Sequence, residues 1–248
     1  MSERFYSTRP ITSDHATLDG PEAHHLLHVM RASVGEEVTL FDGSGAEFSA
    51  QITKLGRSAI DLRIVERHET SRELPFELTV GVALPKGDRQ KWLVEKLTEL
   101  GVTTLVPLTT ERGVAQPTAG ALERLERSVI EAAKQCGRNR LMHIAPPQVW
   151  KEWLQSNEAL GSQPTPAGDS PAILRLVAHP EGPPIGSVQV LQPQPVQLAI
   201  GPEGGFSDAE IAAALAGGWQ IVSLGPRILR VETAAIALAA AIVLETTN

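Results

Sequence analysis

One stretch of the chain, GPEGGFSDAE (residues 201–210), surrounds a single carboxylate, Glu203, with glycine and proline. It follows the apolar run Val196–Ile200, and Ser207 and Glu210 have the spacing of a capping box, which satisfies free amides where a helix begins. We therefore predict a strand-to-helix crossover whose missing side chains let a ligand reach main-chain donors. The spacing is not that of a dinucleotide fold or a P-loop, so a turn without a ligand is an equal alternative for this stretch alone.

A second stretch of the same kind, LGPRILRVETA, covers residues 224–234 and the start of a helix. Two such loops at the carboxyl ends of two strands would form one pocket with many backbone donors and acceptors. Arg227 and Arg230 are two of the four cationic residues after position 150, and they indicate either an anionic substrate or a solvated pair. Glu232 stands just before a helix, where it either positions a reacting group or caps the helix.

Cations gather in two other segments. Lys86, Arg89 and Lys91 crowd the start of a helix within LPKGDRQKWLVEKLTELGV, where they oppose the helix dipole and predict a phosphate partner. In EAAKQCGRNR the cations, Arg138 among them, stand at a helix end that favours them anyway, and Gln135 faces ligand or solvent.

Three histidines lie close together in PEAHHLLHVMR. His24 and His28 have a spacing that can bind a metal, but no carboxylate or thiolate completes a site, so no metal is predicted. His25 and Arg31 fit an RNA-contacting face better.

Two kinds of segment must position these residues. The first part is mostly β: a helix over 21–31 is followed by strands over 38–41, 47–52 and 59–65, and the turn Asp42–Gly45 joins the first two strands. A polar linker spans 66–74. Beyond it strands alternate with helices, which predicts an α/β fold with a parallel sheet covered on both faces. The expected strands are 76–84, 104–108, 173–178, 196–200 and 220–224, and the expected helices are 93–100, 122–135, 208–216 and 233–245. Residues 161–171 read as an exposed loop.

Composition narrows the class of protein. The chain has 248 residues, 42% of them apolar, and its only cysteine, Cys136, excludes an internal disulfide. The longest apolar run, 234–244, is too short to cross a bilayer, and the N-terminus lacks a signal-peptide core, so a cytoplasmic protein is expected. Net charge is −7, yet residues 76–150 are net basic at +2, so a polyanion would be bound by a local patch there.

Taken together, these segments resemble the ribosomal RNA small-subunit methyltransferase E family, a branch of the knotted SPOUT methyltransferases. Six motifs stand in the family's order: HHLLHVMR, FDGSGAEF, LPKGDRQKWLVEKLTELGV, EAAKQCGR, IGPEGGFSDAE and LGPRILRVETAAI. The resemblance departs after QCGR, where the family's early proline is delayed to Pro146. It implies a PUA-like β-barrel for RNA over 1–70 and a SPOUT α/β domain with a deep trefoil knot over 75–248.

The resemblance also implies a homodimer that uses S-adenosylmethionine to methylate N3 of one uridine in 16S rRNA, preferentially in the assembled small subunit. The implied cofactor-binding residues are His179, Pro180, Ile200, Gly201, Pro202, Glu203, Gly204, Gly205, Leu224, Gly225, Ile228, Leu229, Arg230, Thr233 and Ala234. Arg230 is predicted to orient the uridine or stabilise its developing anion, and Glu203 and Glu232 to position groups rather than both act as bases. The implied RNA-binding residues are Arg9, His25, Arg31, Lys86, Arg89, Gln135 and Arg138.

Two alternatives stay open at this point. A non-catalytic RNA-binding or ribosome-assembly protein could keep the fold, although intact glycines in both loops argue against it. A methyltransferase of the same superfamily could act instead on transfer RNA or on a ribose hydroxyl.

Overall fold

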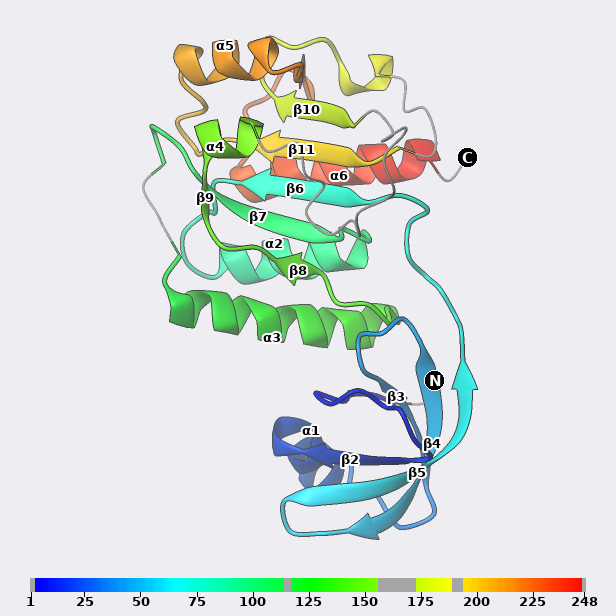
Figure 1. The fold of residues 1–248 in the computed structure, drawn as a ribbon. Helices are drawn as coiled ribbons and strands as arrows, with labels where there is room; N and C mark the ends of the chain where they lie inside the picture. Colours follow the sequence, from blue (N-terminus) through cyan, green and yellow to red (C-terminus); the bar gives the residue numbers. More distant parts are fainter. Residues whose placement is uncertain (1–2, 114–116, 156–172, 189–193, 247–248) are drawn as a thin grey trace. The chain divides into compact units, whose positions relative to one another are not determined.

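The computed structural model describes residues 3–113, 117–155, 173–188 and 194–246 (Figure 1). The chain divides into two compact units. Unit 1 comprises Met1–Glu73 with Ile130–Leu141, and unit 2 comprises Leu74–Val129 with Met142–Asn248. The chain thus returns to unit 1 for a short segment that the sequence did not indicate. None of the described helices is long and apolar enough to cross a membrane.

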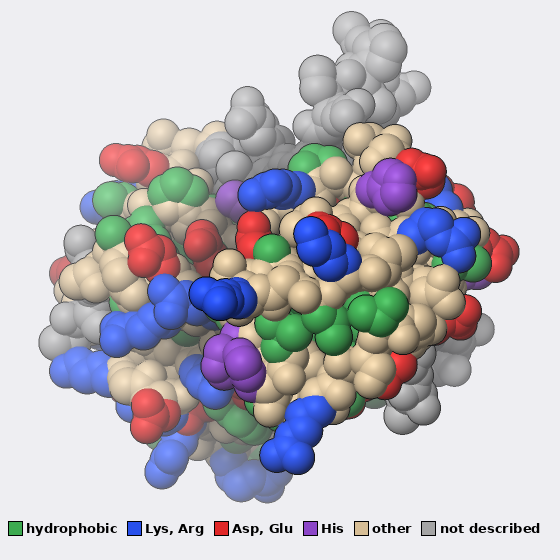
Figure 2. All heavy atoms as spheres, turned by 90° about the horizontal axis from the view of Figure 1, so that it is seen from below, with side chains coloured by type: hydrophobic (Ala, Val, Ile, Leu, Met, Phe, Trp, Pro, Cys, Tyr) green, Lys and Arg blue, Asp and Glu red, His purple; other side chains and the backbone are tan. Residues whose placement is uncertain are grey.

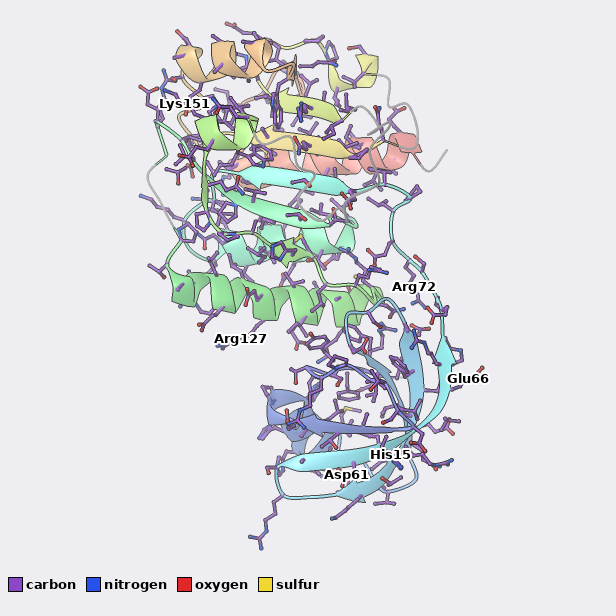
Figure 3. All side chains as sticks on the ribbon, in the orientation of Figure 1. His15, Asp61, Glu66, Arg72, Arg127 and Lys151 are labelled. Atoms are coloured by element: carbon purple, nitrogen blue, oxygen red, sulfur yellow. The ribbon has the colours of Figure 1, made fainter. Side chains whose placement is uncertain are left out.

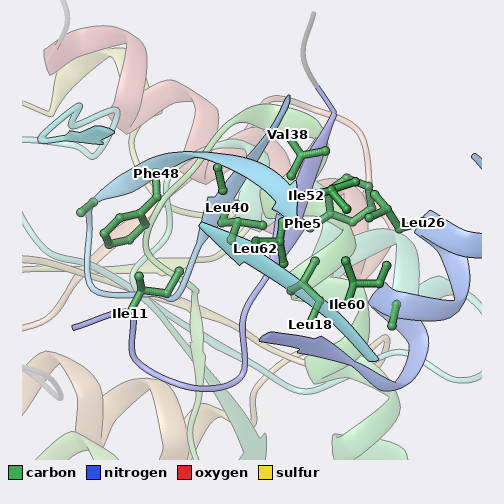
Figure 4. Close-up of a cluster of buried hydrophobic side chains, with 13 residues drawn as sticks. Phe5, Ile11, Leu18, Leu26, Val38, Leu40, Phe48, Ile52, Ile60 and Leu62 are labelled. Atoms are coloured by element: carbon green, nitrogen blue, oxygen red, sulfur yellow. The ribbon is translucent and has the colours of Figure 1, made fainter. Parts of the chain in front are cut away.

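Unit 1 is built on a curled five-stranded sheet in the order β1-β3-β4-β5-β2. The strands are β1 (Arg4–Tyr6), β2 (His15–Asp19), β3 (Glu37–Phe41), β4 (Glu47–Leu55) and β5 (Ala59–His68). Two register shifts between β4 and β5 bend the sheet, as β-bulges do. Alternate residues of each strand therefore turn inward, and Leu40, Phe48, Ile52 and Leu62 form the core drawn in Figure 4.

A short helical segment completes this core. Helix α1 (Gly20–His24) continues directly into a π-helical turn, His25–Val29, and both bury one residue in the core cluster, Ala23 and Leu26. The predicted helix over 21–31 is therefore confirmed in position. It ends two residues early, and it changes from an α-helix to a π-helix at His25.

Buried ion pairs attach residues 130–141 to the rest of unit 1. Arg138 donates to both oxygens of Glu73, with a shortest distance of 2.6 Å, and Lys134 Nζ lies 2.9 Å from Glu22 Oε1. Glu47 Oε2 accepts from Arg4 at 2.7 Å, and from Arg72, labelled in Figure 3, at 3.0 Å.

Unit 2 is built on a parallel sheet whose main path is β12-β10-β11-β6-β7-β8, with β9 beside β7. The strands are β6 (Leu78–Val82), β7 (Thr104–Thr109), β8 (His143–Ile144), β9 (Gln148–Val149), β10 (Leu174–Ala178), β11 (Val196–Ile200) and β12 (Gln220–Val222). Every residue of the central strands β6 and β11 is buried because helices cover both faces. The predicted α/β class with a parallel sheet is confirmed.

The helices of unit 2 are α2 (Arg89–Glu99), α3 (Ala119–Cys136, whose last turns belong to unit 1), α4 (Trp150–Gln155), α5 (Asp208–Ala216) and α6 (Val231–Thr246). Helices α2 and α6 contact each other behind the sheet as drawn in Figure 1, with α4 in front. Trp150, Trp153 and Trp219 pack together with Phe206 beneath α4 and α5. Gly81 of β6 is required there, because an added Cβ would lie 2.6 Å from the Trp153 ring.

Most differences from the predicted elements lie at their ends. Strand β5 runs to His68, into the predicted linker over 66–74, and α6 begins two residues earlier than expected. The sequence did not predict the short elements β1, β2, β8, β9 and α4. An element of only a few residues is too short to show a hydrophobic periodicity. The predicted loop over 161–171 lies outside the described residues.

Glu47 makes unit 1 sensitive to acid. Burial alone would raise the pKa of this carboxyl, but hydrogen bonds from Arg72 and Arg4 and their charges outweigh burial and lower the pKa to about 2. A carboxyl with a depressed pKa stabilises the folded state above its unfolded pKa of 4.5, and this contribution is lost as the pH falls from there to about 2.

We expect Glu47→Gln to lower the free energy of unfolding by up to about 3 kcal/mol at pH 7 and to flatten its pH dependence between pH 4.5 and 2. Urea unfolding across that range measures both effects. Glu69→Gln, in an exposed ion pair with Arg67, is the matched control and should change little. An unchanged acid dependence in Glu47→Gln would contradict this account.

Candidate functional site

Three loops at one edge of the parallel sheet enclose a cavity of about 360 Å³. The loops follow β10, β11 and β12, whose carboxyl ends meet because β10 pairs in parallel with both other strands. All the predicted cofactor-binding residues line this cavity except Arg230 and Thr233. A volume of this size lies within the range of about 300–1000 Å³ that is usual for small-molecule sites.

The walls of the cavity are largely main chain. Gly205 and Gly225 have φ of +69° and +105°, and a Cβ added at either would meet no atom within 4 Å. Both positions therefore need glycine for the backbone conformation. Their amides close the turns, since Gly205 N donates to Pro202 O at 2.8 Å and Gly225 N donates to Ser223 Oγ at 3.2 Å. Gly201 differs, because its missing Cβ makes room for the Phe206 ring, 3.0 Å from where that Cβ would stand.

Apolar side chains complete the lining. Leu224, Leu229 and Ile228 come from the loop after β12, and Ile228 is 93% exposed. A large aliphatic side chain left in water gains free energy when a ligand covers it. The cavity thus combines peptide donors and acceptors with apolar contacts and suits an uncharged ring system.

The glycine-rich loop is held in place from its two ends. The predicted capping box is confirmed: Ser207 Oγ accepts from Glu210 N, and Glu210 Oε2 accepts from Ser207 N at 2.8 Å. Glu111 N donates to Glu210 Oε1 at 2.9 Å, and Ser207 Oγ donates to Glu111 Oε2 at 2.6 Å. Arg112 Nη1 donates to Gly204 O at 3.0 Å.

Sequence reasoning missed Glu111 and Arg112. They stand after β7, two strands away from β11 in the sheet, and only parallel pairing brings them to the loop. The available signal was an adjacent acid and base at the carboxyl end of a buried strand.

A second, shallow depression adjoins the cavity. Its lining residues are Asp88, Arg89, Trp92, Arg230, Glu232 and Thr233. Arg89 Nη2 lies 3.4 Å from Glu203 Oε1, and Arg89 Nη1 lies 3.5 Å from Glu232 Oε2. Arg89 therefore links the glycine-rich loop to the start of α6, and its charge is shared between two carboxylates rather than left for a phosphate.

Glu232 is the buried acid of this depression. Its side chain is 6% exposed, and its Oε2 accepts no hydrogen bond from the described residues, although Arg89 lies close. A carboxylate held this way needs its ion pair, because burial of an unpaired charge is costly. Glu232 lies in the first turn of α6 and lines the depression.

The predicted RNA-binding residues fall into two groups. Arg9, Arg31, Lys86 and Gln135 are exposed, although Arg9 pairs with Asp19 at 3.2 Å. His25 is partly buried, edge-on to Phe5. Arg138 corrects the prediction: its side chain is 4% exposed and bound to Glu73, so its charge holds unit 1 together.

Arg31 has an unusual backbone. It is the one non-glycine residue with positive φ, +56°, in the described part of the chain, and it follows the π-helical turn. Both irregularities are uncommon and gather at functional sites. They turn Arg31 outward at the end of the HHLLHVMR motif.

The histidines of unit 1 do not form a metal cluster. The rings of His24 and His28 lie 4.7 Å apart, but no group of three metal-ligating side chains occurs among the residues that the structure describes.

Family models match both units. An RNA methyltransferase domain matches residues 72–243, and an RNA methyltransferase PUA domain matches residues 18–65. The ribosomal RNA small subunit methyltransferase E of Synechocystis is 37% identical over 88% of this chain and 69% of that protein.

Solved structures agree. A methyltransferase of Legionella pneumophila with bound cofactor SAM matches with a TM-score of 0.85 and 32% identity, over 100% of this chain and 98% of that one. A ribosomal RNA small subunit methyltransferase E of Neisseria gonorrhoeae bound to S-adenosyl methionine matches with a TM-score of 0.83 and 30% identity, over the same shares. The cavity, the order of the strands and these matches lead to one conclusion: the chain belongs to the ribosomal RNA small subunit methyltransferase E family.

Proposed function

We propose that this protein methylates N3 of one uridine in 16S rRNA with S-adenosylmethionine as methyl donor. The observation that carries the proposal is the cavity formed by three loops, with a second depression directly beside it. Two related proteins that match over the whole chain were solved with this cofactor bound.

The cavity fits the cofactor by the chemistry of its lining. Glycine at 205 and 225 lets a ligand approach the main chain closely, and Ile228 and Leu229 suit the flat faces of a nucleoside. When bound, S-adenosylmethionine would supply a methyl group on a positively charged sulfur. Holding that methyl against an oriented acceptor is worth up to about 7–11 kcal/mol of the barrier.

The depression supplies the groups that the acceptor needs. Uridine N3 must lose a proton before its electron pair can take a methyl group. Glu232 Oε2 accepts this proton and passes it to solvent through the open side, while Arg230 stabilises the charge that develops on the ring. Glu203 holds Arg89, and Arg89 holds Glu232, so both act by positioning.

RNA binding is assigned to unit 1 and to the start of α2. Arg9, His25 and Arg31 come from unit 1, and Lys86 precedes α2. Figure 2 shows Lys and Arg side chains on one face, interspersed with Asp and Glu, together with a group of histidine. Since an extruded base enters the depression, these cations would hold the flanking phosphates.

The remaining features follow from the same assignment. RNA binding is assigned to residues 1–70 and catalysis to residues 75–248, of which 130–141 pack in unit 1. The catalytic chain passes from β12 at the sheet edge to α6 against β11 and β6. This crossing supports a trefoil knot.

Helix α6 is apolar around its circumference and half exposed along part of its length, which supports a homodimer. The enzyme acts in the cytoplasm, on the assembled small subunit.

The direct experiment is nucleoside mass mapping of 16S rRNA from a strain lacking this gene, with and without the gene restored. Restoring the gene should restore 3-methyluridine at one position. An unchanged level would refute the proposal, and failure of S-adenosylmethionine to bind in calorimetry would favour a non-catalytic RNA-binding protein.

Two variants separate the cofactor site from the acceptor site. Gly225→Val should weaken S-adenosylmethionine binding tenfold or more, because valine is strained at φ +105° and projects into the cavity. Arg230→Ala should leave that affinity within about threefold and lower the methylation rate about 100-fold, as loss of a charge-stabilising donor does. Calorimetry and single-turnover methylation measure the two effects, and full activity of Arg230→Ala would remove its assigned role.

Arg31 can be tested without disturbing its backbone. Arg31→Asn keeps a residue that tolerates positive φ but removes the charge, so RNA affinity should fall and the salt slope of log K should drop by about one. Arg57→Ala removes an exposed arginine elsewhere in unit 1 and is the control. Equal effects of the two changes would mean that only net charge matters.

A further inference from the structure

One chain segment separates the cavity from the depression. Ile228, Leu229, Val231 and Ala234 line the cavity, whereas Arg230, Glu232 and Thr233 line the depression. Residues 228–234 therefore form a thin wall. Some of their side chains face the cavity, and the others face the depression. A donor in the cavity could reach an acceptor in the depression only past the edge of this wall, because group transfer needs the reacting atoms about 3–3.5 Å apart.

The depression contains an exposed aromatic side chain that no role above uses. Trp92 lies in the first turn of α2 and is 46% exposed, while Trp150, Trp153 and Trp219 are buried. An indole in water at the edge of a polar depression offers a flat surface on which a nucleobase can stack.

The charges of the depression favour a base over a phosphate. Arg89 and Arg230 are balanced by Asp88 and Glu232, so the lining carries no net charge. Arg89 is held by two carboxylates, whereas the guanidinium of Arg230 makes no hydrogen bond or ion pair with the described residues. A neutral ring with carbonyl oxygens, such as uracil, could accept hydrogen bonds from the guanidinium of Arg230 and lie against the indole of Trp92.

We propose that Trp92 is the stacking platform for the extruded uracil and that the depression between α2 and the start of α6 is the base-binding subsite. This inference rests on the proposed function. Stacking on Trp92 orients the ring, Arg230 binds a carbonyl oxygen, and N3 is thereby presented at the edge of the wall, where it can meet the methyl group. Trp92 is a positioning residue for the acceptor and contributes nothing to cofactor binding.

Steady-state methylation of small subunits tests the platform. Trp92→Ala should lower kcat/KM for RNA tenfold or more, and Trp92→Phe should restore it to within about threefold because it keeps an aromatic face. Leu215→Ala, on α5 and 49% exposed, is the control of similar exposure and should change nothing. Affinity for S-adenosylmethionine and the mass in solution should stay those of the wild type.

Fluorescence gives a readout independent of turnover. Because the other tryptophans are buried, acrylamide should quench mainly Trp92. With S-adenosylhomocysteine present, a short single-stranded RNA containing one uridine should protect Trp92 from acrylamide, and the same RNA with an abasic site there should not. Trp92→Phe should abolish the protected signal.

Three results would overturn the inference: wild-type kcat/KM in Trp92→Ala, equal protection by the uridine and abasic RNAs, or dissociation of a dimer in Trp92→Ala, which would place Trp92 between two copies. Absence of methylation by the wild-type protein would instead defeat the proposed function. The fluorescence experiment would still report whether uracil contacts Trp92, so the two failures are distinguishable.

Discussion

Parallel pairing of β10 with both β11 and β12 is the constraint on which the site depends. Three loops that are far apart in the sequence leave the sheet at one edge because their strands run in the same direction. The cavity is therefore a product of strand order, and its walls can be bare main chain because the sheet and the side chains of Glu210 and Arg112 hold them.

Rigidity at this edge comes from carboxylates that bind backbone and cations. Glu210 ties the start of α5 to the peptide of Glu111, and Arg112 holds Gly204 from the same side. Across the cavity, Arg89 joins Glu203 to Glu232 and so couples the loop after β11 to α6. Such pairs contribute modestly to stability where they are exposed, and their larger effect here is to fix the position of groups around two adjacent binding sites.

Unit 1 uses charge differently. Its apolar core is small, and Lys134 and Arg138 pair with Glu22 and Glu73. Arg4 and Arg72 pair with Glu47 and also donate to residues 137–139. Basic residues in this unit are thus of two kinds, those that hold the fold and those that remain on the surface. Arg31, displayed by a strained backbone after a π-helical turn, belongs to the second kind.

The sequence by itself determined the class of fold, the main strands of unit 2, the capping box at Ser207 and the two glycine-rich loops, whereas most of the cavity lining was implied by the family resemblance. These features depend on local periodicity, on glycine in loops and on hydroxyl and carboxylate spacing, all of which act over a few residues. It did not determine which charged side chains are buried in ion pairs and which are exposed. Arg138 and Lys134 occupy the same helix end as exposed Gln135, and the neighbours that bury them, Glu73 and Glu22, are distant in sequence.

Only the tertiary structure decided which residues face which side of the wall over 228–234, and that Trp92, Arg89 and Arg230 share one depression. Helix α2 and the loop before α6 are separated by more than 120 residues, and their proximity follows from packing α2 against α6 behind the sheet. Sequence spacing carries no information about such contacts, because they depend on the order of strands and the hand of their connections.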